Sequence, residues 1–233
     1  MSALYKKIAP LFLAVELGLY IVILFFYEAI PYPDFIGIAI AVAFSLCFFH
    51  PTLPNLLLNV GLLATLGADV FLVLLDHENY DYQVIAMLFF SITQLSYFVY
   101  LFLTEKRSKI RNLHIAVRGG AILAAETAML LVLKENTDAL SVLSLFYIAN
   151  LAVNGIFAYA QGKKVRLFAI GLTLFLCCDL FVGFTVAIGN YIPAAESSLL
   201  YRIVFSDFNF VWFFYLPSQV CISLYTALRR RQA

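Results

Sequence analysis

The stretch TLGADVFLVLLD, from Thr65 to Asp76, places a carboxylate, Asp69, inside a run of residues that otherwise favours an apolar environment. A second stretch, LFLCCDLFVGF from Leu174 to Phe184, does the same with Asp179. Apolar residues make up 64% of the 233-residue chain, charged residues only 12%, and the mean hydropathy is +0.94. Soluble domains are about half apolar and a quarter charged. The composition therefore indicates a protein whose solvent is a lipid bilayer.

A helix that spans a bilayer needs about 20 mostly apolar residues. Short proline-rich or polar turns divide the chain into eight such segments, and no soluble domain or long linker separates them. The second segment is the shortest and is bounded by PYPD and HPTLP. The sequence therefore predicts an all-α, polytopic integral membrane bundle of eight transmembrane helices, in a single transmembrane domain over residues 1–233. The expected helices cover approximately residues 9–30, 34–50, 55–76, 82–103, 113–133, 139–160, 166–189 and 207–228.

The basic residues divide unequally between the two sides of this bundle. With eight crossings, both termini lie on the side of the even-numbered connections. Thirteen Lys and Arg residues fall on that side, Arg118 among them, and two, Lys134 and Arg202, fall on the other. Basic residues accumulate in cytoplasmic loops, so we expect both termini to be cytoplasmic. In a bacterium, such a multi-pass protein would lie in the plasma membrane.

The two halves of the chain share weak sequence similarity. GADVFLVLL in the third expected helix and CCDLFVGFT in the seventh share the pattern D-[VL]-F-[LV]. Gln94 and Tyr100 in the fourth have the same spacing as Gln219 and Tyr225 in the eighth. This pattern predicts a parallel repeat of four plus four helices. Chance similarity between apolar segments is the alternative.

The chain lacks the motifs of several other kinds of site. It contains no CxxC pair, no HExxH motif and no glycine-rich phosphate loop, and its three histidines show no ligand spacing. The four cysteines lie in apolar runs, where they are expected to act as small buried hydrophobic residues. No basic tract with interleaved aromatics suggests nucleic acid. We therefore expect no metal, no cofactor and no nucleic-acid partner, and we infer no obligate protein partner.

Four acidic residues fall well inside expected helices: Glu16, Asp69, Glu126 and Asp179. An ionisable group at bilayer depth costs about 2.5–3.5 kcal/mol on insertion scales, so such residues face the bundle interior and usually have a function. A structural role, with the acid bonded to a polar group of a neighbouring helix, is the alternative. Function is favoured for Asp69 and Asp179 because they occur in matching local sequences.

Polar residues also recur at helical spacing on the fourth, sixth and eighth expected helices. Such stripes face one another or water, and not lipid. They predict either hydrogen bonds between helices or a polar cavity with Asp69 and Asp179 at its walls. The stripes are formed by Ser91, Gln94 and Tyr97, by Tyr147, Asn150 and Asn154, and by Tyr215, Gln219 and Ser223.

A buried carboxylate pair can divide acid and anion roles between its members. Burial disfavours an ionised carboxylate, and a nearby second carboxylate disfavours two negative charges. Glycosidases use this combination to cleave acetals through oxocarbenium-like transition states. In a membrane, the bond that is attacked would belong to a lipid. A vinyl ether fits, because it hydrolyses by proton transfer to carbon followed by capture of the oxocarbenium ion by water.

The order of LGAD, FFSITQLSYFVYLF (89–102), FLCCDLFVGF and YLPSQVCISLY (215–225) resembles the YhhN family of lysoplasmalogenases. These are eight-helix membrane proteins that cleave the vinyl ether of lysoplasmalogens to a fatty aldehyde and a glycerophospho-base. The similarity covers the third to the eighth expected helix. The chain differs in the inserted Ala68 before Asp69, in Cys178 where the family has serine, and in Gln94 where it usually has histidine.

The resemblance implies that Asp69 and Asp179 are the catalytic pair. The substrate would be an ether or vinyl-ether lysophospholipid, taken from among the membrane lipids. Two other functions are compatible with the sequence: a small proton-coupled membrane transporter, and a non-catalytic membrane sensor on the same fold. Residues of the family motif and the polar stripes would bind the substrate, namely Gln94, Tyr97, Asn150, Asn154, Tyr215 and Gln219.

Overall fold

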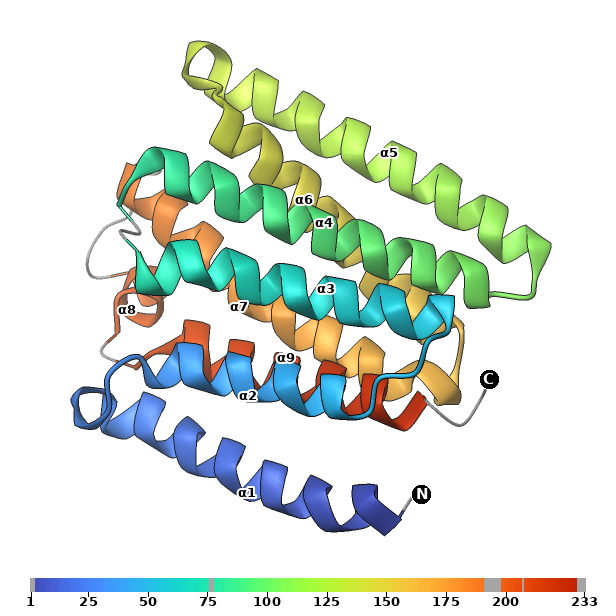
Figure 1. Cartoon of the computed structure of the whole chain (residues 1–233). Coiled ribbons are helices and arrows are strands. Elements are labelled where there is room, and N and C mark those ends of the chain that lie inside the picture. The colour runs from blue at the N-terminus through green and yellow to red at the C-terminus, as the bar shows by residue number, and fades with distance from the viewer. Residues whose placement is uncertain (1–2, 76–77, 191–197, 207, 230–233) are drawn as a thin grey trace.

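A computed structural model describes residues 3–75, 78–190, 198–206 and 208–229, and every regular element within them is a helix. The long elements lie side by side along one direction (Figure 1). In chain order, the α-helices are α1 (Ala3–Phe25), α2 (Pro33–Cys47), α3 (Leu53–Asp69), α4 (Tyr80–Thr104), α5 (Ser108–Leu133), α6 (Ala139–Ala160), α7 (Arg166–Asn190), α8 (Leu199–Val204) and α9 (Phe210–Leu228).

Seven of the described helices are long and apolar enough to cross a membrane: α1, α3 with its extension to Leu74, α4, α5, α6, α7 and α9. The prediction of a helical membrane bundle is therefore confirmed. Helix α2 is apolar but has only 15 residues. At 1.5 Å per residue it is about 22 Å long, whereas the hydrocarbon core is about 30 Å thick. The eighth crossing therefore stays a prediction.

Polar side chains cap the starts of three helices, two of which, α4 and α9, begin at other residues than hydropathy indicated. Asn79 accepts hydrogen bonds from the backbone of the first turn of α4, which begins two residues before its expected start. Asp138 and Ser141 form a capping box at the start of α6. Asn209 caps α9, so this helix begins at Phe210. Such caps satisfy amide groups that the first helical turn leaves free. The short helix α8, capped by Ser198, was not expected.

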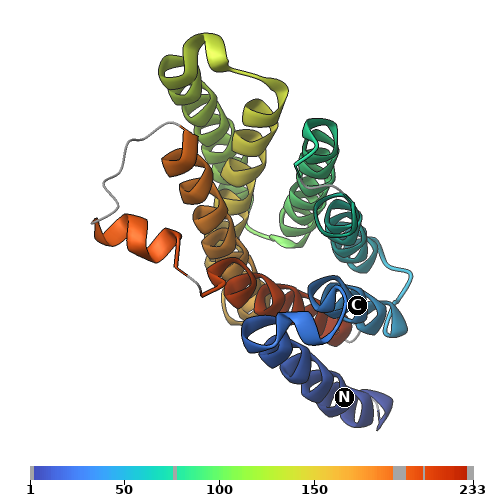
Figure 2. The ribbon, with the colours of Figure 1, turned by 90° about the vertical axis from the view of Figure 1, so that its left-hand side faces the viewer.

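Six helices form a ring of contacts in the order α2, α3, α4, α6, α7 and α9, with α9 returning to α2. Helix α1 packs outside this ring on α2 and α9, and α5 packs outside it on α6 (Figures 1 and 2). The contacts of α1 with α2, of α2 with α3 and of α3 with α4 have counterparts in α5 with α6, α6 with α7 and α7 with α9. This pattern of neighbours is compatible with the four-plus-four repeat, which remains a prediction.

Glycines bring three pairs of ring helices close together. A Cβ atom on Gly61 of α3 would lie 2.2 Å from a ring carbon of Tyr97 on α4. At Gly171 of α7 it would lie 2.7 Å from Ile222 on α9. At Gly37 of α2 it would lie 2.8 Å from Leu216 on α9. Small residues permit such approach between membrane helices. These contacts hold α3 and α7, which carry the two aspartates, against their neighbours.

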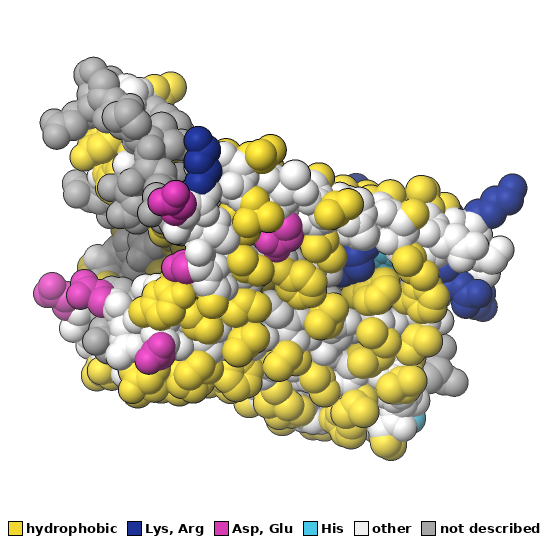
Figure 3. All heavy atoms as spheres, turned by 90° about the horizontal axis from the view of Figure 1, so that it is seen from above, with side chains coloured by type: hydrophobic (Ala, Val, Ile, Leu, Met, Phe, Trp, Pro, Cys, Tyr) yellow, Lys and Arg dark blue, Asp and Glu magenta, His cyan; other side chains and the backbone are white. Residues whose placement is uncertain are grey.

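Opposite charges gather at opposite ends of the bundle. The start of α1 and the end of α9 lie at one end, with the connections from α4 to α5 and from α6 to α7 (Figure 1). On the face shown in Figure 3, acidic side chains concentrate toward the other end, and most of the surface between is hydrophobic. Arg118, which was counted with the basic side, is buried inside α5, which begins at Ser108. The cytoplasmic placement of the termini stays a prediction.

Candidate active site

Asp69 lies on the buried face of α3. This face follows helical spacing through Leu58, Leu62, Thr65 and Asp69, and the Asp69 side chain is 2% exposed. A π-helical turn, Val70–Leu74, follows directly, and the Leu75 N–H donates to the Val70 carbonyl oxygen at 3.0 Å. Single π turns inside α-helices are frequent at functional sites. Because its side chain is buried, Asp69 faces the bundle interior despite the inserted Ala68.

Each aspartate accepts a hydrogen bond from a tyrosine of another helix. The Tyr215 hydroxyl of α9 donates to both carboxyl oxygens of Asp69, at 2.8 and 2.9 Å. The Tyr147 hydroxyl of α6 donates to Oδ2 of Asp179 on α7. Both tyrosines are 4% exposed, whereas Asp179 is only partly buried. The two carboxyl groups therefore occupy different environments, one enclosed and one accessible.

The two aspartate–tyrosine pairs lie in one region of the interior. The Phe175 ring centre is 5.3 Å from that of Tyr215 and 6.2 Å from that of Tyr147. Tyr147 and the thiol of Cys178 each lie within electrostatic reach of both Asp69 and Asp179. Among the described hydrogen bonds, none joins one carboxyl group to the other. The expected acid pair is thus two aspartate–tyrosine units beside each other.

A second polar cluster lies next to the first along α6. The Asn154 side-chain amide donates to the backbone oxygen and to Oε1 of Gln94 on α4, at 2.9 and 3.0 Å. Arg118 of α5 donates to Oδ1 of Asn150 and to Oδ1 of Asn154. The structure thereby brings together three of the expected substrate-binding residues. It adds Arg118, which the sequence pattern did not single out for the site.

The two remaining expected binding residues are buried without a described hydrogen bond to either aspartate. Tyr97 is fully enclosed, its ring against Gly61 and edge-on to Phe168 at 5.1 Å. Gln219 lies one turn beyond Tyr215 on α9, and its amide donates to Ser218 Oγ at 3.2 Å. Their positions suit a supporting wall of the site, and their assignment to substrate binding stays a prediction.

Asp34 is a buried acid that the sequence pattern did not identify as a site residue. It lies in the first turn of α2, is 2% exposed and is within electrostatic reach of Asp69. The hydroxyl of Tyr27 donates to it at 2.8 Å, and burial together with this carboxylate raises the pKa of Tyr27 to about 12. An acid in a first helical turn is ordinarily explained by the helix dipole, so its position alone gives no functional signal.

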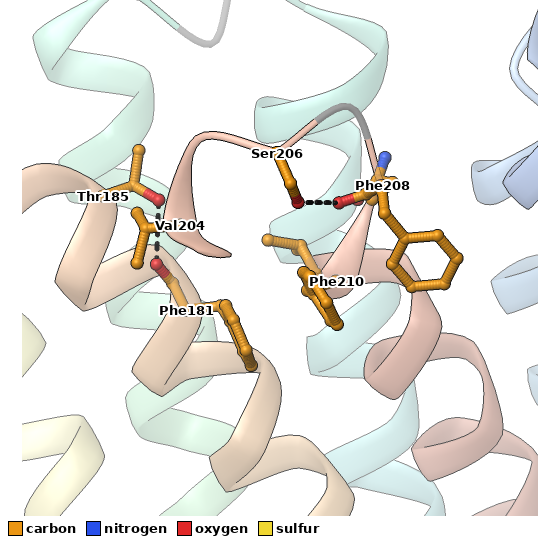
Figure 4. A pocket seen from close by; sticks show the side chains of 8 residues that line it. Phe181, Thr185, Val204, Ser206, Phe208 and Phe210 are labelled. Carbon is orange, nitrogen blue, oxygen red and sulfur yellow. Dashed lines mark hydrogen bonds between the residues drawn. The ribbon is translucent and has the colours of Figure 1, made fainter. Parts of the chain in front are cut away.

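An open pocket of about 270 Å³ lies where α7 and α9 approach the connection between them. In Figure 4 the rings of Phe181 and Phe210 lie side by side at this pocket, and the ring centres are 4.8 Å apart. Phe181 is two residues beyond Asp179 on α7, and neither aspartate lines the pocket. The pocket therefore adjoins the region of the carboxyl groups, and none of the residues of the polar stripes lines it. Its lining consists of Phe181, Thr185, Val204, Ser206, Phe208, Asn209, Phe210 and Val211.

A bundle of long apolar helices with two aspartate–tyrosine pairs inside defines a polytopic membrane protein with a buried acidic site. The chain belongs to the YhhN family, whose model matches residues 35–226. The match runs from the first turn of α2 almost to the end of α9 and confirms the resemblance. Membership suggests a lysoplasmalogenase-like membrane protein, and the family is associated with hydrolase activity. No curated protein and no solved structure matches the chain.

Proposed function

We propose that the protein is a membrane-embedded hydrolase that cleaves the vinyl ether bond of lysoplasmalogens. The products are a fatty aldehyde and a glycerophospho-base. The observation that carries this proposal is the pair of carboxyl groups, each bound by a tyrosine and both within reach of Tyr147 and Cys178. Family membership supports the same class of reaction.

We assign the proton-donating role to Asp179. Its side chain is partly accessible, and Tyr147 binds its Oδ2 atom, so the second oxygen is left for a substrate. The proton passes from this carboxyl group to the second carbon of the alkenyl chain. The first alkenyl carbon then becomes an oxocarbenium ion with the ether oxygen. Acid catalysis of this kind contributes typically 10²- to 10⁴-fold to a rate.

Asp69 has the electrostatic role. Burial disfavours its ionised form, whereas the hydrogen bonds from Tyr215 to both of its oxygens favour and orient the anion. A fixed negative charge stabilises the oxocarbenium ion as it forms. Water then adds to the first alkenyl carbon, and its proton returns to the Asp179 carboxylate. The hemiacetal releases the aldehyde when its bond to the glycerol oxygen breaks and that oxygen takes a proton. One water molecule is consumed.

The proposal is tested by aldehyde release from a lysoplasmalogen by the purified protein and by Asp69→Asn and Asp179→Asn. We expect both substitutions to reduce turnover at least a hundredfold while the helical content and unfolding temperature stay close to wild type. Asp81→Asn, at an exposed aspartate in the first turn of α4, is the matched control and should keep full activity. Full activity in either site variant contradicts the mechanism. Lipid flux across sealed vesicles without aldehyde would instead support the transporter alternative.

A further inference from the structure

Arg118 is a cation placed inside a membrane-spanning helix. It lies well within α5, is 7% exposed, and packs over the Phe98 ring at 4.0 Å. Its guanidinium donates to the two α6 asparagines and lies 3.1 Å from His114 Nε2. A charged side chain at such a position is costly and usually serves a function.

Arg118 has no carboxylate partner among the described residues, where the ion pair within 4 Å is that of Arg107 with Glu105. Its contacts are neutral amides, an imidazole and an aromatic ring. The Arg118 Nε–H and the Gln94 Nε2 amide are buried and have no hydrogen-bond partner in the described part of the chain. The cluster thus combines one positive charge with unused hydrogen-bond donors, which is the chemistry that recognises an anion.

The position of this cluster matches the shape of the proposed substrate. Asn150, which binds Arg118, and Tyr147, which binds Asp179, are three residues apart on α6. This spacing corresponds to about 4.5 Å along the helix axis, on nearly the same face. In a lysophospholipid, one glycerol unit separates the phosphate from the ether oxygen of the chain. Asn150 and Asn154, which bind Arg118, follow Tyr147 on α6 in the direction of the connection to α7, and that connection lies at the end of the bundle where α1 begins (Figure 1).

We infer that Arg118, which Asn150 and Asn154 hold in place through their Oδ1 atoms, binds the phosphate group of the lysophospholipid together with the Gln94 amide and so places its ether bond at Asp179. This inference rests on the proposed function. The guanidinium suits a phosphodiester because it stays positively charged and its Nε–H donor is unused among the described residues. Helix α5, which carries Arg118, packs mainly on α6 at the edge of the bundle.

The test is equilibrium binding of a saturated alkyl-ether lysophosphatidylcholine, which cannot be hydrolysed, and of the monoalkylglycerol with the same chain, which lacks phosphate. We expect Arg118→Gln to weaken binding of the phospholipid about ten- to a hundredfold, the usual cost of a lost charged hydrogen bond. Binding of the monoalkylglycerol should be unchanged. Arg111→Gln on the same helix, where Arg111 packs over Phe102, is the control and should bind both ligands as wild type does.

Arg118→Lys keeps the charge without the planar group and should bind the phospholipid about tenfold more weakly than wild type. This variant tests the inference if Arg118→Gln does not fold. Equal loss of both ligands in these variants would show that Arg118 only supports the fold and would overturn the inference. So would displacement of the lipid by inorganic phosphate at the same concentration, since the site would then take a free anion. Because the probe is not cleaved, absence of aldehyde release would contradict the proposed function and leave this binding result standing.

Discussion

The hydroxyl group of Tyr215 lies 2.8 and 2.9 Å from the two carboxyl oxygens of Asp69, and this contact joins α9 to α3 across 146 positions of the chain. Both side chains are enclosed, at 4% and 2% exposure. A hydrogen bond to a charged group in such surroundings is stronger than one exposed to water. It therefore holds the carboxyl group in one orientation toward the interior.

Removal of this donor tests the role of Asp69. We expect Tyr215→Phe to lower kcat for aldehyde release about ten- to a hundredfold, because a hydrogen bond to a charged group contributes roughly 1.5–3 kcal/mol. Tyr159→Phe is the matched control, since the Tyr159 hydroxyl accepts a hydrogen bond from Thr173 at an exposed position. Equal kcat values for Tyr215→Phe and wild type would remove Tyr215 from the mechanism.

The pairing of Tyr147 with Asp179 leads to a prediction about coupling. Tyr147→Phe should reduce kcat with little change in KM, because the tyrosine orients the proton donor. In a double-mutant cycle, the variant with both Tyr147→Phe and Asp179→Asn should be no slower than Asp179→Asn alone. Additive losses in kcat would mean that the two residues act independently.

Gly61 supports the site through packing. Its missing Cβ leaves room for the Tyr97 ring, and a methyl group there would lie 2.2 Å from a ring carbon. We expect Gly61→Ala to reduce the free energy of unfolding by about 1–3 kcal/mol, the usual cost of overpacking. Gly119→Ala, where nothing lies within 4 Å, should be neutral or stabilising. Thermal unfolding in detergent compares the two, and equal stability would contradict the close contact of α3 with α4.

The basic end of the bundle carries a pH-sensitive contact. Hydrogen bonds from the Arg107 side chain, at 2.7 and 2.9 Å, lower the pKa of Glu105, which follows the last residue of α4. A lowered pKa stabilises the folded state fully above the ordinary glutamate pKa of about 4.3, and the gain is lost as the pH falls through the lowered value. Wild type should therefore lose more stability than Glu105→Gln between pH 6 and pH 3. The difference should be small and shrink with salt, because Arg107 is 55% exposed.

The polar stripes were predictable because a bilayer penalises polar groups that face lipid. Gln94, Asn150, Asn154 and Gln219 are all fully buried, as their helical spacing indicated. Their partners were not predictable from spacing. That Tyr215 binds Asp69 depends on the contact of α9 with α3, which lies far away in the chain.

Arg118 shows a different reason for a missed residue. The segment SKIRNLHIAVR carries a basic side chain every few positions, so hydropathy placed the start of its helix at residue 113, and Arg118 was counted only as one of the basic residues of one side. The helix begins at Ser108 and buries Arg118 against α6. Amide and aromatic partners on other helices offset the free-energy cost of burying this charge. A hydropathy profile of one segment carries no information about such partners.

The most direct test of the central claim traces the proton that Asp179 donates to the second carbon of the alkenyl chain. A lysoplasmalogen is hydrolysed in D₂O, and the aldehyde is analysed by mass spectrometry, with unlabelled aldehyde incubated under the same conditions as the exchange control. We expect wild type to give aldehyde with one deuterium on its second carbon and Asp179→Asn to give almost no product. Aldehyde without deuterium at that carbon, or labelled aldehyde formed by Asp179→Asn at the wild-type rate, would contradict proton transfer from Asp179.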